Sequence, residues 1–305
     1  MSLLVVGSMA IDNLKSPAGH RPEVIGGAAT FSSTTAAFFH PVRVVSVIGA
    51  DFPEEPLAEL GKRGIDCSGV ERTEGESFRW TGEYGEDFGD AKTIDTKLGV
   101  LATFDPVLPE SFRDSRFVFL ANNDPDIQGK IIDQLEDPEL IALDTMNFWI
   151  EGKREALLKT IARVDLLLVN DTEARMLSGE KNIVKAAAAI QKLGPQIVII
   201  KRGEFGAMLF VGDAKPFFVP AMPLTDVVDP TGAGDSFAGG LTGYLAGKGK
   251  VDAETLRQAM VAGSALASFA VQGFGLDRLW EASREELQER LEGFVELTRF
   301  EPLPH

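Results

Sequence analysis

The amino-acid sequence predicts an α/β protein whose mostly parallel central sheet is covered by helices. Continuous apolar runs rich in Val and Ile, rather than alternating runs, are typical of strands buried on both faces. Amphipathic helical patterns such as EEPLAELGKRG and IVKAAAAIQKLG lie between these runs, and alternation of strand and helix is typical of a parallel sheet. The predicted strands are LLVVG (3–7), VRVVSVIG (42–49), FVFLAN (117–122), LIALDT (140–145), DLLLVN (165–170) and QIVIIKRG (196–203).

Residues 1–305 contain no internal repeat or low-complexity linker, so we expect a single domain. Residues 77–104 depart from the main pattern, because polar and apolar side chains alternate there between glycines. This predicts antiparallel strands that project from the main body together with residues 13–25. They would form a lid over a site, although an ordinary surface extension of a sheet has the same pattern. From Val251 to Phe300 the chain is predicted to be helical.

Composition and charge exclude several classes of partner. The formal net charge of −16 comes from 30 basic and 46 acidic residues, and it repels nucleic acids and anionic membranes. No apolar run reaches the ~20 residues of a membrane helix. The lone Cys67 cannot form an internal disulfide, and the start of the chain does not resemble a signal peptide. We therefore expect a cytoplasmic protein that binds neither nucleic acid nor membranes.

The stretch DVVDPTGAGDSFAGG predicts an anion-binding site. Asp229-Pro230 indicates a turn, and the helical pattern that follows puts Gly232, Ala233 and Gly234 at a helix N-terminus. Unpaired N–H groups and the positive end of the helix dipole face outward there, and glycine lets an anion approach the backbone. A carboxylate beside such a site, Asp235, would accept a proton from an attacking hydroxyl. The alternative is that Asp235 only caps the helix.

The segment DPTGAGDSFAGG resembles the C-terminal signature of the ribokinase family, also called the pfkB family of carbohydrate and nucleoside kinases. The resemblance implies a ribokinase-like three-layer α/β/α fold with a small β-stranded lid. It implies transfer of the γ-phosphoryl group of ATP to a hydroxymethyl group of a small sugar-type acceptor. In this chain Asp235 would be the general base, Gly232, Ala233 and Gly234 would form the anion hole, and Thr231 would contact ATP. No P-loop is present.

Two further segments fit a nucleotide site. Asn170 and Glu173 lie at the end of a predicted strand, with the spacing of a helix capping box. In the resembled family this N-x-x-E motif contacts the nucleotide and organises Mg²⁺ through water, and one carboxylate with waters suits that ion. Lys201, Gly203 and Gly206 form a K-x-G-x-x-G loop, which by itself predicts a tight turn. The resemblance gives this loop contacts with ATP.

The acceptor site is predicted near the N-terminus. The segment VVGSMAID predicts a buried strand that ends at Asp12, and a carboxylate there can accept hydrogen bonds from two hydroxyl groups. Gly26 and Gly27 open a predicted helix, where bare backbone lets a polyol approach. Phe31 follows five positions into this segment, where many relatives have Asn. Its ring would either flank an acceptor or belong to the core.

The sequence leaves alternative acceptors and further sites open. A nucleoside acceptor is favoured by Phe31 and by the aromatic lid residues Phe78, Trp80 and Tyr84, and a non-catalytic sugar- or nucleotide-sensing module is a third possibility. Relatives that bind K⁺ beside the anion hole suggest a monovalent cation at Asp229 and Thr231. Family-like pairing of lids predicts a homodimer. Asp144 and Asn147 follow a buried strand, and no role is assigned to them.

Overall fold

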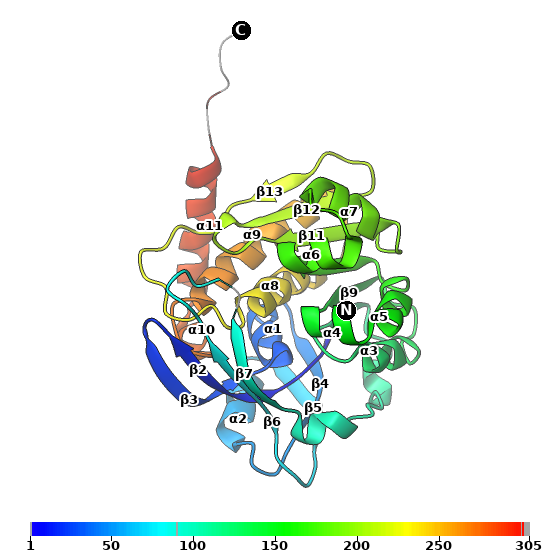
Figure 1. The fold of residues 1–305 in the computed structure, drawn as a ribbon, viewed down its shortest axis with the longest axis vertical. Helices are drawn as coiled ribbons and strands as arrows, with labels where there is room; N and C mark the ends of the chain where they lie inside the picture. The colour runs from blue at the N-terminus through cyan, green and yellow to red at the C-terminus, as the bar shows by residue number, and fades with distance from the viewer. Residues whose placement is uncertain (1, 90, 300, 302–305) are drawn as a thin grey trace.

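A computed structural model of the protein describes residues 2–89, 91–299 and 301. Its central sheet runs through the whole molecule (Figure 1). Within these residues the sheet has nine strands in the order β13-β12-β11-β10-β9-β8-β1-β4-β5. The strands from β5 to β11 are parallel, and β12 is antiparallel to both of its neighbours. The strands are β1 (Leu3–Val6), β4 (Val42–Ile48), β5 (Ile65–Arg72), β8 (Phe117–Leu120), β9 (Leu140–Asp144), β10 (Leu166–Asn170), β11 (Ile197–Lys201), β12 (Ala207–Val211) and β13 (Phe217–Val219).

All six predicted strands are present, and they are buried on both faces as their apolar runs indicate. Alternate residues of each strand belong to two separate hydrophobic cores. In β8, for example, Phe117 and Phe119 belong to one core, whereas Val118 and Leu120 belong to the other. The three-layer α/β/α prediction is therefore confirmed.

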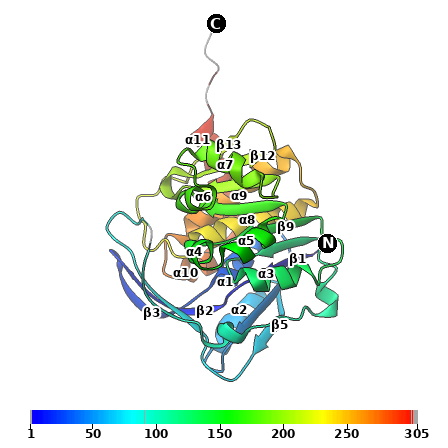
Figure 2. The same cartoon turned by 45° about the vertical axis from the view of Figure 1, so that its right-hand side comes forward.

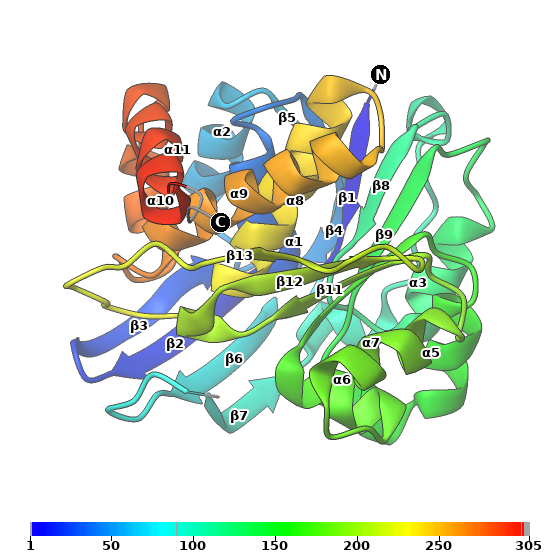
Figure 3. The same cartoon turned by 90° about the horizontal axis from the view of Figure 1, so that it is seen from above.

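Helices cover both faces of the sheet (Figure 3). The first core packs under α1 (Ala28–Ala36), α2 (Glu54–Lys62), α8 (Ala233–Lys248), α9 (Ala253–Ala270), α10 (Asp277–Glu281) and α11 (Arg284–Thr298). The second core packs under α3 (Pro125–Ile132), α4 (Asn147–Gly152), α5 (Arg154–Ile161), α6 (Asp171–Ser178) and α7 (Ile183–Gln191). No helix in the part of the chain that the structure describes is long and apolar enough to cross a membrane.

A second sheet has four strands in the order β3-β2-β6-β7: β2 (Ala10–Ser16), β3 (Gly19–Gly26), β6 (Phe78–Glu83) and β7 (Lys92–Lys97). In Figures 1 and 2 it lies at the opposite end of the molecule from β12 and β13. The predicted lid segments thus pair with each other. Antiparallel pairing is confirmed for β6 with β7 and for β2 with β3, whereas β2 and β6, which join the two segments, are parallel.

The end of the predicted lid also differs from the expectation. Residues Gly99–Thr103 form a 3₁₀ helix, η1, and Val100 and Phe104 are buried in the second core. Because Val100 and Phe104 are buried in that core, this segment does not continue the small sheet. Asp90 lies in the predicted lid, and Phe300 ends the predicted helical region. Both residues lie outside the described residues.

Glycines let α8 pack closely against its neighbours. A Cβ on Gly239 would lie 2.1 Å from the Ser32 carbonyl oxygen of α1, and one on Gly243 would lie 2.5 Å from Cα of Ala36. Such distances leave no room for a side chain, so helix packing rather than ligand contact explains these glycines. The close packing fixes the position of the α8 N-terminus, where the candidate site lies.

Candidate active site

The glycine loop leads into α8 as the sequence predicts. Gly232 is the residue before the helix and has φ of 75°, a left-handed conformation that favours glycine. Within the described residues, no side chain caps this helix end. Asp235 is the third residue of α8, so the interpretation of Asp235 as a helix cap has no support. The Ala233 N–H donates to the Pro230 carbonyl oxygen at 3.1 Å, so among the described residues the N–H groups of Gly232 and Gly234 are left to meet an anion.

Three charged side chains meet at the start of α8. Nζ of Lys201 lies 2.7 Å from Oδ2 of Asp144, and a Cβ on Gly234 would lie 3.1 Å from that Nζ. Burial raises the pKa of Asp235 to about 7, Asp144 adds to this rise, and Lys201 opposes it. A carboxyl group with a pKa near 7 is suited to accept a proton at neutral pH.

Strand register explains why these residues meet. Asp144 pairs with Leu168 across β9 and β10, and Asn170 pairs with Lys201 across β10 and β11. Leu168 belongs to the core under α8, and side chains two apart share a face. Asp144, Asn170 and Lys201 therefore all end their strands on the face that α8 covers.

Asp12 and the paired glycines also come together. Asp12 is 4% exposed, and its Oδ2 would lie 1.9 Å from a Cβ on Gly26, so only glycine leaves room for this carboxyl group. Burial raises the pKa of Asp12 to about 8, with further contributions from Asp229 and Asp235. Oδ1 of Asp12 is buried without a hydrogen-bond partner among the described residues. One expectation is corrected: Asp12 lies within β2 of the small sheet, not at the end of a central strand.

Of the two interpretations of Phe31, the structure favours the core over a wall of the acceptor site. Phe31 is 1% exposed and belongs to the core. Its ring lies directly beneath the glycine loop, since a Cβ on Gly232 would be 2.5 Å from three ring carbons. The buried ring supports the loop from below and offers no open face.

The loop before α8 carries a second buried carboxyl group. Asp229 is 0% exposed, and its Oδ1 accepts hydrogen bonds from the Thr231 N–H at 3.1 Å and the Thr231 hydroxyl at 2.8 Å. Oδ2 has no partner within the described residues. Tyr84 reaches this loop from the small sheet, with its hydroxyl 3.3 Å from that of Thr231. Burial raises the pKa of Tyr84, and Asp229, Asp12 and Asp235 add to the rise.

The two nucleotide-site motifs adopt the predicted local structures. Asn170 and Glu173 form a capping box: each backbone N–H donates to the side chain of the other at 2.7 Å. Gly203 and Gly206 have φ of 55° and 85° and make the tight turn between β11 and β12. No three His, Cys, Asp or Glu side chains are grouped to hold a metal ion in the described part of the chain.

The sequence does not predict that Asp144 and Tyr84 lie with the charged side chains around Asp235. The sequence by itself assigns no role to Asp144, although this residue follows a predicted buried strand. Tyr84 was considered only as an aromatic lid residue. The signal for Asp144 was available, because Asp144, Asn170 and Lys201 all end parallel strands. Asn147, the other residue without a role, is exposed and starts α4.

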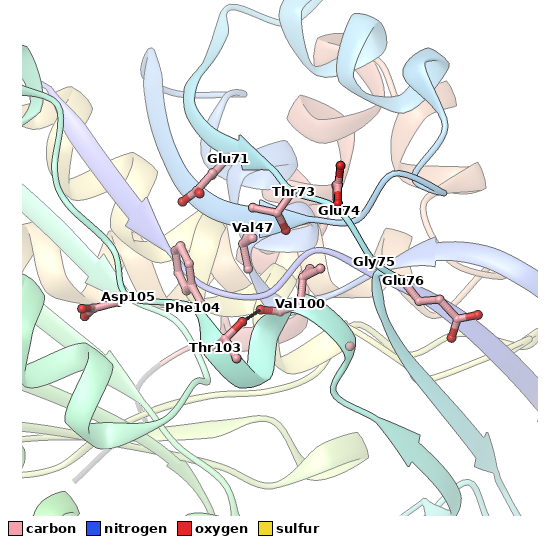
Figure 4. Close-up of a pocket in the computed structure, with 11 residues that line it drawn as sticks. Val47, Glu71, Thr73, Glu74, Gly75, Glu76, Val100, Thr103, Phe104 and Asp105 are labelled. Carbon is pink, nitrogen blue, oxygen red and sulfur yellow. Dashed lines mark hydrogen bonds between the residues drawn. The ribbon is translucent and has the colours of Figure 1, made fainter.

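A separate cavity of about 670 Å³ lies between β4, β5 and η1 (Figure 4). None of its lining residues belongs to the cluster around Asp235. Four of them carry carboxylates, Glu71, Glu74, Glu76 and Asp105. Like charges repel, so this cavity is unsuited to phosphorylated ligands.

Comparison with known proteins shows the class to which this protein belongs. Residues 131–282 match the model of the pfkB family carbohydrate kinases. A cytidine kinase from Thermococcus kodakarensis is 32% identical over 256 residues, which cover 81% of this chain and 90% of that protein. The chain therefore belongs to the pfkB family, and it is an ATP-dependent kinase of a sugar or nucleoside.

Solved structures share the fold over almost the whole chain. A putative ribokinase II from E. coli has a TM-score of 0.79 at 20% identity, covering 97% of this chain and 99% of that one. The ribokinase of Arabidopsis thaliana, solved with ribose and ATP, has a TM-score of 0.76 at 23% identity, covering 95% and 98%. The α/β architecture and its small second sheet are thus those of a known kinase fold.

Proposed function

We propose that this kinase transfers the γ-phosphoryl group of ATP to a hydroxymethyl group of a small sugar-type acceptor, with Asp235 as the general base. One observation carries the proposal: Asp235 stands in the first turn of α8, free of any capping role, with its pKa raised to about 7. Asp235 would take the proton of the attacking hydroxyl as the new P–O bond forms.

Charge on the transferred group would be stabilised by the α8 N-terminus. Gly232, Ala233 and Gly234 form the proposed anion hole, with the N–H groups of Gly232 and Gly234 as donors because that of Ala233 donates to Pro230. Lys201 lies against this hole. Gly203, Gly206 and Thr231 are proposed to contact ATP. Because the chain carries a net charge of −16, such local neutralisation is required for a nucleotide to bind.

The acceptor is proposed to bind between the small sheet and α1. The unpartnered Oδ1 of Asp12 is suited to a hydroxyl group. Gly26 leaves room for this carboxyl group, and Gly27 packs against the backbone of residues 8–10, where a Cβ would lie 2.5 Å from the Ser8 carbonyl oxygen. We propose that residues 1–305 act as one kinase domain, in which the small sheet is a lid that excludes water from ATP.

Magnesium fits the residues at the N-x-x-E motif. Asn170 and Glu173 would hold it through water, and the capping box orients both side chains. One carboxylate with waters is a usual setting for this ion, which dehydrates reluctantly. When bound, Mg²⁺ supplies positive charge to the phosphates of ATP.

We also propose that the protein works in the cytoplasm.

A nucleoside is the second candidate acceptor. The cytidine kinase relative supports it, as do the half-buried aromatic side chains of Phe78, Trp80 and Tyr84 in and beside the lid. Phe31 no longer supports it, since its ring is buried. A non-catalytic sensing module is disfavoured by the family membership and by the intact Asp235.

Turnover with ATP and Mg²⁺ against a panel of acceptors tests the proposal. The panel contains pentoses, hexoses, keto-deoxy acids, inositols and ribonucleosides, and a coupled assay records ADP formation. We expect one chemical class to exceed the others in kcat/KM by at least about a hundredfold, because a site that hydrogen-bonds acceptor hydroxyls discriminates strongly. Highest kcat/KM for a ribonucleoside would select the second candidate, and equal background with every compound would contradict both.

We expect a monovalent cation such as K⁺ to activate the enzyme. Oδ2 of Asp229 is buried without a partner among the described residues, and a carboxylate oxygen suits a hard cation. Such an ion would hold the loop of Asp229 and Thr231 in place beside the anion hole. Turnover is to be compared in K⁺, Na⁺ and tetramethylammonium buffers of equal ionic strength. Equal rates in all three would show that no such ion is needed.

We expect a homodimer that pairs through the lids. Strand β7 is an edge strand, and all six of its residues are exposed, including Ile94 at 52%. An exposed strand edge favours pairing with another strand. Light scattering at micromolar concentration gives the mass directly. A monomer there would exclude the dimer without affecting the proposed active site.

A further inference from the structure

The buried ion pair of Lys201 and Asp144 lies beside the proposed anion hole. The proposed mechanism gives Lys201 a role but gives none to Asp144. The side chains of Lys201 and Asp144 are only 17% and 5% exposed. Every other Lys–Asp pair among the described residues is more exposed. A buried ion pair adds little net stability, because desolvation offsets the attraction. Its presence at this sheet edge therefore calls for another explanation.

The Asp144 carboxylate is held at both oxygens. Oδ1 accepts a hydrogen bond from the Thr145 N–H at 2.9 Å, and Oδ2 accepts one from Lys201 at 2.7 Å. The backbone carbonyl of Asp144 accepts from Nε2 of the buried Gln128 at 3.2 Å, and the same amide donates to Ala121 at 2.9 Å. Asp144 is thus a fixed acceptor at the end of β9.

The fixed carboxylate in turn determines where the Lys201 ammonium lies. Nζ is against the first turn of α8, 3.1 Å from the position of a Cβ on Gly234. Burial opposes the charge of Lys201, but Asp144, Glu173 and Asp235 together raise its pKa, so the amine stays protonated. A flexible four-carbon side chain would otherwise distribute this charge over several rotamers.

We propose that Asp144 is a positioning residue for phosphoryl transfer: it holds the Lys201 ammonium over the N-terminus of α8, facing the transferred phosphoryl group. The inference rests on the proposed anion hole and deepens it. A charge held in place before the reaction stabilises the transition state more than the bound substrates. Asp144 therefore acts on kcat, through Lys201, and much less on the KM of either substrate.

A double-mutant cycle tests this dependence. Asp144→Asn is expected to lower kcat about 10- to 100-fold, the order found when a catalytic group shifts by about 1 Å. Lys201→Met should lower kcat by about 10²–10³-fold, as for loss of an anion-hole donor. In the Lys201→Met background, Asp144→Asn should have almost no further effect on kcat, because the two residues act as a unit.

A second variant covers the case in which Asp144→Asn does not fold. Asp144→Glu keeps the charge but adds a methylene group, so it moves the ammonium without leaving it unpaired. We expect a Tm close to that of the unmodified protein and a clear loss of kcat. Asp252→Asn is the matched control, since Asp252 pairs with Lys250 at the far end of α8. Its kcat should be unchanged.

The outcomes separate this inference from the proposed function. If Asp235→Asn keeps its activity, the proposed site itself is wrong. If Asp235→Asn is inactive but Asp144→Glu keeps full kcat, only the positioning role is wrong. Multiplicative losses in the Asp144→Asn/Lys201→Met double variant would likewise overturn it, because Asp144 would then act independently of Lys201. If Asp144→Asn lowered Tm and left kcat unchanged, the pair of Asp144 and Lys201 would only stabilise the fold, and the positioning role would be wrong.

Discussion

Asp235→Asn is expected to lower kcat by about 10²–10⁴-fold, the usual cost of losing a general base. The amide keeps the shape of the side chain but cannot take the proton of the acceptor hydroxyl. ATP affinity should hold or increase, because a negative charge near the phosphates has been removed. Turnover with the best acceptor is measured together with ATP affinity by calorimetry and with Tm.

Asp226→Asn serves as the control for this experiment. Asp226 lies in the segment that leads to the glycine loop, but it is exposed, and the same chemical change there should leave kcat unaltered. If the Asp235→Asn variant keeps more than about a tenth of the original kcat, well short of the loss expected for a general base, the proposed mechanism is wrong.

Phe31→Ala is expected to lower the free energy of unfolding by about 3–5 kcal/mol, the range for removing a buried aromatic ring. Phe31 is 1% exposed and supports Gly232 from below. The cavity left by the ring opens directly beneath the anion hole, so kcat should fall as well, while the acceptor KM changes little. Urea unfolding followed by circular dichroism measures the stability change.

Phe218→Ala is the matched substitution for stability. Phe218 is 49% exposed on the edge strand β13, and surface substitutions usually change stability by less than about 0.5 kcal/mol. The buried interpretation of Phe31 would be refuted if Phe31→Ala kept full stability and raised only the acceptor KM. That result would restore the ring as a wall of the acceptor site.

Local pattern and spacing determined the secondary structure and the position of the glycine loop. The apolar runs that became β1, β4 and β8 to β11 are long enough to identify buried strands. Gly232 to Asp235 could be placed at the start of a helix because glycine, proline and the following helical pattern act over a few residues. The capping box of Asn170 and Glu173 was predictable for the same reason.

Only the tertiary structure decided which side chains share the site. Phe31 is 201 positions before Gly232 in the sequence and still lies beneath it. The pairing of Asp144 with Lys201 depends on the order of β9, β10 and β11 in the sheet. The contact of Tyr84 with Thr231 depends on how the small sheet packs against the glycine loop. These contacts are set by packing between distant segments, which local periodicity does not encode.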